Sequence, residues 1–198
     1  MAPACSDAQR TDLDGAGGWC ARAQILDNDL TLIAVHTGGS WTDTAEALAR
    51  EVRPVFKALI AQALAAGLEV GVATFSSQPE LIAHVLALAV PCEGIERVVV
   101  RAGLRAVAGV DEPVVEVTSE VRARFMAHGS GKQGHIASIV QRVEARCGGR
   151  QLQAHEVWLI DDDENNVVQA RRNGMQAALF NPNEPNCIPG IAELPRQL

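Results

Sequence analysis

The sequence predicts an α/β fold in which a parallel sheet carries helices on both faces. Short apolar runs typical of buried strands recur along the chain, and stretches with helical spacing of apolar residues separate them. Strands that alternate with helices favour parallel pairing through right-handed crossovers. The expected strands are residues 23–26, 68–73, 97–101, 156–160 and 175–180.

The first long helical pattern covers residues 45–66, which lie between the first two expected strands. Apolar residues recur there at spacings of three and four. Pro54 lies inside the pattern and predicts a split or a kink, because proline cannot donate the helical hydrogen bond. Gly67 follows it and suits a C-terminal stop.

The remaining helices are expected at residues 79–88, 133–146 and 164–173. The first opens with proline and glutamate, which suit an initial helical turn, and glycines follow the other two. Residues 102–131 show no regular pattern. Alternating valines at 114, 115 and 117 suggest a hairpin or a short strand in that segment.

Length and composition indicate one soluble domain. The chain has 198 residues, of which 47% are hydrophobic and 21% charged, and its formal charge of −7 argues against a nucleic-acid or anionic-membrane surface. No signal-peptide pattern and no membrane-spanning run is visible. We expect an N-terminal arm at residues 1–20 and a single domain at residues 21–198.

The five cysteines favour reduced thiols. They are odd in number and show no CxxC spacing, so neither a zinc site nor a disulfide framework is expected. Reduced thiols predict a cytoplasmic location. The cysteines are Cys5, Cys20, Cys92, Cys147 and Cys187.

Two carboxylates, Asp27 and Asp29, follow the first expected strand. Open α/β sheets bind ligands at the carboxyl ends of their strands, and like charges so close together favour a bound cation, a shared proton or a reaction that uses both states. A turn pair that caps backbone amides is the plain alternative. A calcium loop would need Asp or Asn at position 31 and glycine at 32, where the chain has Thr31 and Leu32.

Three further features follow in order. Thr74 comes directly after the second expected strand, Lys132 lies between glycines before a helix, and acids occupy positions 161–163 after the fourth strand. Lys132 is one of only two lysines, and a flexible ammonium before a helix suits an anion site. Together with the first acidic pair, these features predict a site for phosphate and Mg²⁺.

The four motifs resemble those of the haloacid dehalogenase-like (HAD) phosphatase superfamily, over residues 23–180. The resemblance implies a three-layer, Rossmann-like parallel sheet with strand order 5-4-1-2-3. The first, second and fourth strand ends would then meet. One helix takes up most of the interval between the first two expected strands, and the next interval has room only for the expected helix, strand and irregular loop, so no separate cap domain is expected. The compact layout, with an acidic pair followed by Asn166, is similar to the magnesium-dependent phosphatase-1 group. Asn166 would brace the acidic loop.

The resemblance also implies roles for the polar residues. Asp27 would be the nucleophile that forms an aspartyl-phosphate, and Asp29 would protonate the leaving group and then take a proton from water. Thr74 and Lys132 would bind the phosphoryl group. Thr31 would support the loop by holding the two aspartates apart.

The implied metal ligands are Asp27, the backbone carbonyl of Asp29, and Asp161. Asp162 would lie behind them and orient the lysine or a water molecule. Asp163 is expected to cap the following helix. Because the three acids are adjacent, Asp161 and Asp162 could exchange roles.

Histidines lie near the expected site. His36 falls in a turn-rich stretch, residues 36–44, where HAD proteins carry a flap that touches substrate. His128 and His135 flank Lys132. A turn histidine is more often structural than functional, so these three are the weaker candidates.

The predicted function is Mg²⁺-dependent hydrolysis of phosphomonoesters. Without a cap domain the site would be open to a phosphoprotein or another large phosphoester, and no nucleic-acid or membrane partner is expected. A signalling receiver module, a HAD-fold binding module without activity and a phosphotransferase remain as alternatives. The order of the acidic motifs favours the phosphatase over the receiver, and the sequence leaves the oligomeric state open.

Overall fold

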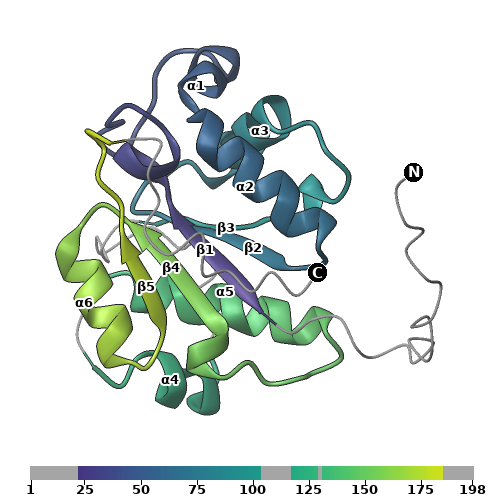
Figure 1. The fold of residues 1–198 in the computed structure, drawn as a ribbon, viewed down its shortest axis with the longest axis vertical. Coiled ribbons are helices and arrows are strands. Elements are labelled where there is room, and N and C mark those ends of the chain that lie inside the picture. Colours follow the sequence, from purple (N-terminus) through teal and green to yellow (C-terminus); the bar gives the residue numbers. More distant parts are fainter. Residues whose placement is uncertain (1–21, 104–116, 129–130, 185–198) are drawn as a thin grey trace, which may run out of the picture.

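The computed structural model describes residues 22–103, 117–128 and 131–184 (Figure 1). All four strand pairs of its five-stranded sheet are parallel, and the order is β3-β2-β1-β4-β5. This is the predicted order viewed from the other edge, so the predicted fold class is confirmed. The strands are β1 (Ala23–Asp27), β2 (Glu69–Ala73), β3 (Val99–Arg101), β4 (Val157–Asp161) and β5 (Gln176–Leu179).

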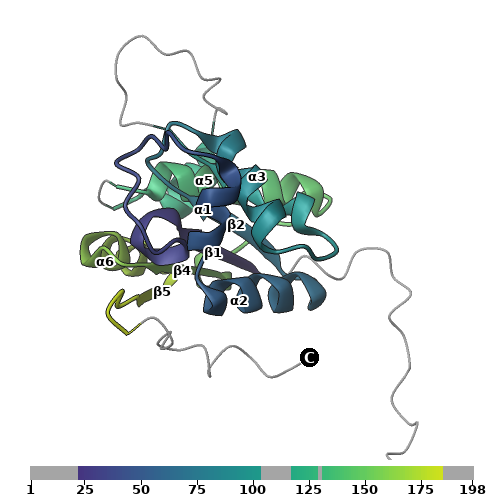
Figure 2. The same cartoon turned by 90° about the horizontal axis from the view of Figure 1, so that it is seen from above.

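Helices cover both faces of the sheet, and Figure 2 shows β1 and β4 between α2 and α5. The α-helices are α1 (Ala45–Glu51), α2 (Pro54–Ala65), α3 (Pro79–Ala89), α4 (Ser119–Phe125), α5 (Gln133–Arg146) and α6 (Glu164–Arg172). Short turns are the irregular η1 (Asn28–Leu32) and the 3-10 turns η2 (Ile95–Arg97) and η3 (Ala154–Glu156).

Two apolar clusters lie on opposite faces of the sheet. One joins alternate strand residues such as Leu26 and Val72 to α1, α2 and α3, and the other joins Ile25 and Leu159 to α4 and α5. Every residue of β1 is buried, which is typical of a parallel strand covered on both sides. The core thus holds the strand ends in fixed positions.

The helix at residues 45–66 is split near Pro54, as predicted. The break lies at Val52 and Arg53, where Val52 forms an antiparallel bridge with Ile33. The first amide of a helix has no partner within the helix, and Pro54 at this position of α2 has no amide hydrogen that would need one. The split therefore lets the chain pair with the segment that follows β1.

The prediction of an irregular segment at 102–131 was wrong for residues 119–125, which form α4. This helix buries only Val121 and Phe125, one pair at helical spacing, so its sequence carries little periodic signal. Thr118 caps it by accepting a hydrogen bond from the Val121 N–H (3.4 Å). The third strand begins at Val99, later than expected, because residues 95–97 form η2.

Several predictions fall outside the described residues: the arm at 1–20, the valines at 114 and 115, and the chain beyond 184. Within the described ranges, the interval between β1 and β2 contains η1, a loop at residues 33–44, α1 and α2. The absence of a cap domain and the domain boundaries stay predictions.

The expectation of reduced thiols was wrong for Cys147, which is disulfide-bonded, whereas Cys92 is free. Disulfides are rare in cytosolic proteins, so this bond gives the predicted cytoplasmic location no support. No helix in the described ranges is long and apolar enough to cross a membrane.

Candidate active site

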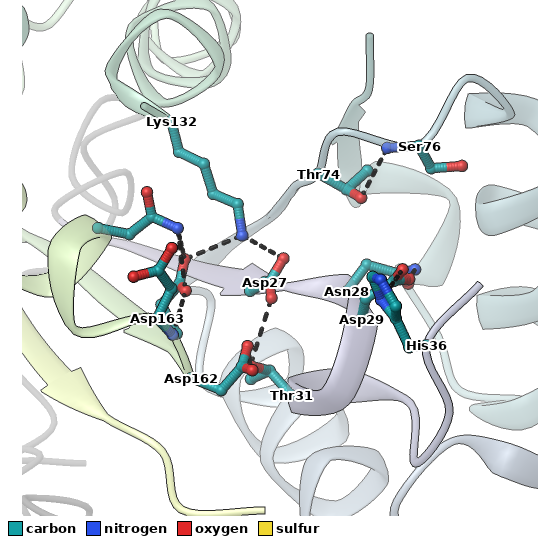
Figure 3. Close-up of polar contacts among 12 residues, drawn as sticks. Asp27, Asn28, Asp29, Thr31, His36, Thr74, Ser76, Lys132, Asp162 and Asp163 are labelled. Atoms are coloured by element: carbon teal, nitrogen blue, oxygen red, sulfur yellow. Dashed lines mark hydrogen bonds and ion pairs between the residues drawn. The ribbon is translucent and has the colours of Figure 1, made fainter. Parts of the chain in front are cut away.

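The carboxyl ends of β1, β2 and β4 bring the predicted polar residues to one edge of the sheet (Figure 3). Asp27 ends β1 and pairs with Ala73, which directly precedes Thr74. Asp161 ends β4, whose residues pair with β1. Lys132, at the start of α5, extends its side chain toward Asp27.

Lys132 is buried among carboxylates, with 3% of its surface exposed. Its Nζ forms an ion pair with Asp27 Oδ1 and another with Asp161 Oδ2 (3.0 Å). The ring of Phe75 lies 5.7 Å from the ammonium. The lysine is therefore part of the site and not a solvated loop residue.

Glycine before this lysine allows the loop to pass close to α6. Gly131 has φ +112°, and a Cβ atom there would lie 2.8 Å from Asn166 Oδ1. Any side chain would push the loop away from Asn166 and strain its backbone. The glycine thus sets the place from which Lys132 enters the site.

Asp161 is fully buried, and its carboxylate is held from several sides. Oδ1 accepts hydrogen bonds from the Asp163 N–H (2.9 Å) and Asn166 Nδ2 (3.1 Å), and Asn166 also reaches Oδ2 (3.2 Å). Asp163 caps α6 by accepting from the Asn165 N–H (2.8 Å). The predicted brace by Asn166 and the predicted cap by Asp163 are confirmed.

Thr31 joins the first acidic motif to the last. Its hydroxyl lies 2.9 Å from Asp162 Oδ1 and 3.4 Å from Asp27 Oδ2 (Figure 3). We expected this hydroxyl to separate Asp27 from Asp29, but its contacts are with Asp27 and Asp162. It thereby fixes Asp162 beside the nucleophile candidate.

Three carboxylates form a group that could hold a metal ion. Oxygen atoms of Asp27, Asp161 and Asp162 lie within 4.8 Å of one another. A set made only of oxygen donors suits a hard divalent cation such as Mg²⁺. The Asp29 carboxylate is not part of this group, so Asp29 could serve the cation only through its backbone carbonyl.

The electrostatics of the group also favour a cation. Burial raises the pKa of Asp27 well above its ordinary range, and the charge of Asp161 adds to this while Lys132 opposes it. Burial likewise raises the pKa of Asp161. Burial lowers the pKa of Lys132, but the two carboxylates outweigh it and the net shift is upward. The single positive charge of Lys132 does not balance the negative charges of these carboxylates. A divalent cation would supply the missing positive charge.

The Asp29 side chain is turned toward the loop that follows. Its Oδ2 accepts hydrogen bonds from the backbone N–H (3.0 Å) and hydroxyl (2.8 Å) of Thr37, and its Oδ1 accepts from Asn28 Nδ2 (2.8 Å). His36 Nδ1 lies 3.1 Å from Oδ2, although 68% of the His36 side chain is exposed. Thr37 was not among the predicted site residues, because a hydroxyl in a turn-rich stretch carries no spacing signal.

The turn that carries Asp29 has an unusual backbone. Leu30 in η1 has φ +60°, the only positive φ of a non-glycine residue in the described ranges. Such a conformation costs a leucine about 1–2 kcal/mol. The Ile33 N–H closes the turn on the Asn28 carbonyl (3.0 Å). Surrounding contacts must hold this turn, since the leucine itself disfavours it.

Thr74 is buried after β2. Its hydroxyl oxygen accepts a hydrogen bond from the Ser76 N–H (3.1 Å), which leaves the hydroxyl hydrogen available to a phosphoryl oxygen. Ser76 in turn donates to the Gly39 carbonyl (3.3 Å). The segment after β2 therefore anchors the loop that carries Thr37.

The two histidines beside Lys132 differ in their surroundings. His135 packs edge to face on Phe75, with ring centroids 5.3 Å apart, and burial lowers its pKa. His128 donates its backbone N–H to Asn173 Oδ1 (3.0 Å) and accepts from Asn173 Nδ2 (2.8 Å). Neither arrangement indicates a catalytic role.

The sequence matches no protein-family model and no curated protein. The HAD domain of the effector protein Lem4 from Legionella pneumophila aligns at 11% identity and TM-score 0.48, over 83% of this chain and 88% of that one. CbbY from Rhodobacter sphaeroides, in complex with phosphate, aligns at 15% and 0.45, over 82% and 88%. A HAD-like phosphatase from Mesorhizobium loti aligns at 22% and 0.47, over 82% and 77%. At these identities and scores the likenesses carry no argument about function, which must be inferred from the site itself.

Proposed function

We propose that this protein is a Mg²⁺-dependent phosphomonoester hydrolase that works through an aspartyl-phosphate on Asp27. The observation that carries the proposal is the group formed by Asp27, Lys132, Asp161 and Asp162 at the carboxyl edge of the sheet. Thr74 ends the neighbouring strand. Phosphoryl transfer requires a positioned nucleophile and positive charge around the phosphoryl oxygens, and this edge can supply both.

In the first half-reaction, an Asp27 carboxylate oxygen attacks phosphorus and the bond from phosphorus to the leaving oxygen breaks. Protonated Asp29 gives its proton to that oxygen, so an alcohol departs and the aspartyl-phosphate remains. Lys132 and the Thr74 hydroxyl bind the phosphoryl oxygens. In this step the Asp29 carboxyl group must rotate away from Thr37 and toward the leaving group.

In the second half-reaction, a water oxygen attacks phosphorus and the bond to Asp27 breaks. Asp29 takes a proton from this water and is ready for another cycle. Phosphate leaves and Asp27 returns to its carboxylate form. The net reaction consumes one water molecule and one phosphomonoester and produces an alcohol and phosphate.

A bound Mg²⁺ would neutralise charge on the carboxylates and phosphoryl oxygens and hold them in line. Asp27, Asp161 and Asp162 would hold it, with the Asp29 backbone carbonyl as the further ligand expected from the HAD resemblance. Thr31 and Asn166 would keep these carboxylates in place through the hydrogen bonds described above.

The substrate class we propose is a phosphorylated protein or another large phosphoester. The support is the resemblance to capless members of the superfamily, near the magnesium-dependent phosphatase-1 group. A chain without a cap domain would leave the edge of the sheet open to a large substrate. A cytoplasmic location and the absence of nucleic-acid and membrane partners belong to the same proposal.

The first test compares the intact protein with Asp27→Asn in Mg²⁺-dependent hydrolysis of an aryl phosphate. The amide cannot attack phosphorus, so we expect a loss of about 10³-fold or more. Asp43→Asn, an exposed acid in the loop after β1, is the matched control and should keep full activity. Added chelator should also abolish turnover.

Equal activity of the intact protein and Asp27→Asn would refute the mechanism. Transfer of phosphate to an added alcohol in place of water would identify a phosphotransferase. If the intact protein binds Mg²⁺ and phosphate without turnover of any phosphoester in a broad panel, the HAD-fold binding module without activity becomes the better explanation.

A further inference from the structure

Arg53, in the break between α1 and α2, contacts the turn that carries Asp29. Its backbone N–H donates to the Leu32 carbonyl (3.0 Å), and its Nη2 donates to the Leu30 carbonyl (3.1 Å). Both acceptors belong to η1. Arg53 lies 23 positions away from Leu30 in the sequence and holds its carbonyl. Leu30 is the one non-glycine residue with positive φ in the described ranges.

The Arg53 guanidinium also contacts the core next to Asp161. Its Cζ atom lies 5.3 Å from the centroid of the Phe180 ring, and that ring packs edge to face on Phe56, 5.1 Å away. The Phe180 N–H donates to the Asp161 carbonyl (2.8 Å). Arg53 thus joins the turn after β1 to Phe180, which follows β5 and is bonded to the last residue of β4.

Arg53 has no carboxylate partner among the described residues, and its Nε–H is buried without an acceptor. Arginine stays charged, and a buried N–H without an acceptor reduces stability. An ion pair therefore does not explain its place. The contacts that remain are those with η1 and with the Phe180 ring.

We infer that Arg53 is a positioning residue that holds the left-handed backbone of Leu30 and so sets the direction of the Asp29 carboxylate. Leucine disfavours this conformation, so the turn depends on groups outside it. The hydrogen bond to the Leu30 carbonyl is the contact from a distant side chain that fixes this peptide unit. The catalytic consequence rests on the proposed function, whereas the hold on the turn does not.

The first experiment measures hydrogen exchange of the Leu30 and Ile33 amides in the intact protein and in Arg53→Met. Methionine can still pack over Phe180 but cannot donate. We expect both amides to exchange about tenfold faster, because the turn opens more often without its brace. Arg50→Met, an exposed arginine in α1, should leave both rates unchanged. Unchanged rates in Arg53→Met would overturn the inference.

The second experiment compares an aryl phosphate, which has a good leaving group, with an alkyl phosphate, which has a poor one. Loss of Asp29 positioning should reduce kcat for the alkyl ester about tenfold or more and for the aryl ester much less, with KM unchanged. In an Asp29→Asn background, Arg53→Met should have no further effect. An equal loss of kcat on both esters would mean that Arg53 has a structural role and does not position Asp29.

A third variant covers the case in which Arg53→Met folds poorly. Arg53→Lys keeps the charge and one donor, so we expect its exchange rates and leaving-group dependence to fall between those of the intact protein and Arg53→Met. Absence of all hydrolysis in the intact protein would refute the proposed function, while the exchange rates would still decide whether Arg53 holds the turn.

Discussion

Two clusters of polar residues lie near the carboxyl end of β1, and they are built in different ways. The first is the strand-end cluster of Asp27, Lys132, Asp161 and Asp162, in which strand ends and the start of α5 hold mostly buried groups. The second is the loop cluster of Asp29, His36 and Thr37, which is partly exposed and held by neighbours on one loop. The sheet therefore preorganises the charged groups of the strand-end cluster, whereas the Asp29 carboxylate depends on contacts with its own loop.

The largest effect should follow removal of the Lys132 charge in the strand-end cluster. Lys132→Met leaves buried carboxylates without their ammonium partner and would remove the proposed phosphate ligand, so we expect activity to fall about 10³-fold or more. Lys57→Met, which changes the only other lysine, is the matched control and should keep activity. Steady-state rates with an aryl phosphate provide the measurement. A loss below about tenfold would show that the strand-end cluster is not the phosphate site.

An intermediate effect is expected on the pH dependence of metal binding. Because the pKa of Asp27 and that of Asp161 are raised in the fold, their protonated forms stabilise it at low pH, and this contribution is lost as the pH rises through the folded pKa values. Mg²⁺ bound at these carboxylates, as proposed, would compete with those protons. It should therefore raise the Tm more at about pH 8 than at about pH 5.5.

Thermal unfolding with and without Mg²⁺, at both pH values, tests this prediction. Asp27→Asn should lose part of the pH dependence of the Mg²⁺ effect, because one of the two competing proton sites is gone. A Tm increase that is the same at both pH values would contradict the proposal that the carboxylates with raised pKa values bind the metal.

The smallest effect should come from the loop cluster. Thr37→Val removes the hydroxyl that donates to Asp29 but keeps the backbone N–H contact, so we expect kcat to fall about three- to tenfold and Tm to change little. Thr42→Val, an exposed threonine in the same loop, should have no effect. A loss as large as that of Lys132→Met would mean that the two clusters work as one rigid unit.

Much of the fold could be predicted because the strands are short apolar runs and the main helices have clear periodicity. The chief error was α4, whose single buried pair, Val121 and Phe125, is too short a pattern to recognise. The alignment of Asp27, Thr74 and Asp161 was predictable for the same reason, since the carboxyl ends of neighbouring parallel strands lie at one edge.

The loop contacts could not be predicted in this way. Thr37 reaches Asp29 because η1 turns the chain through a left-handed leucine, which sequence preference disfavours. Arg53 reaches Leu30 only because Val52 pairs with Ile33 in the break between α1 and α2. Neither contact leaves a spacing pattern in the sequence.

The sequence by itself determined the strands, the main helices and the polar residues at the strand ends, because burial and hydrogen bonding impose regular spacing on the residues of each element. Only the tertiary structure decided that Asp162 joins Asp27 and Asp161, that Asp29 turns toward Thr37, and that Arg53 braces the turn. These contacts arise between segments far apart in the chain or within an irregular turn, where side-chain directions depend on packing and not on local periodicity.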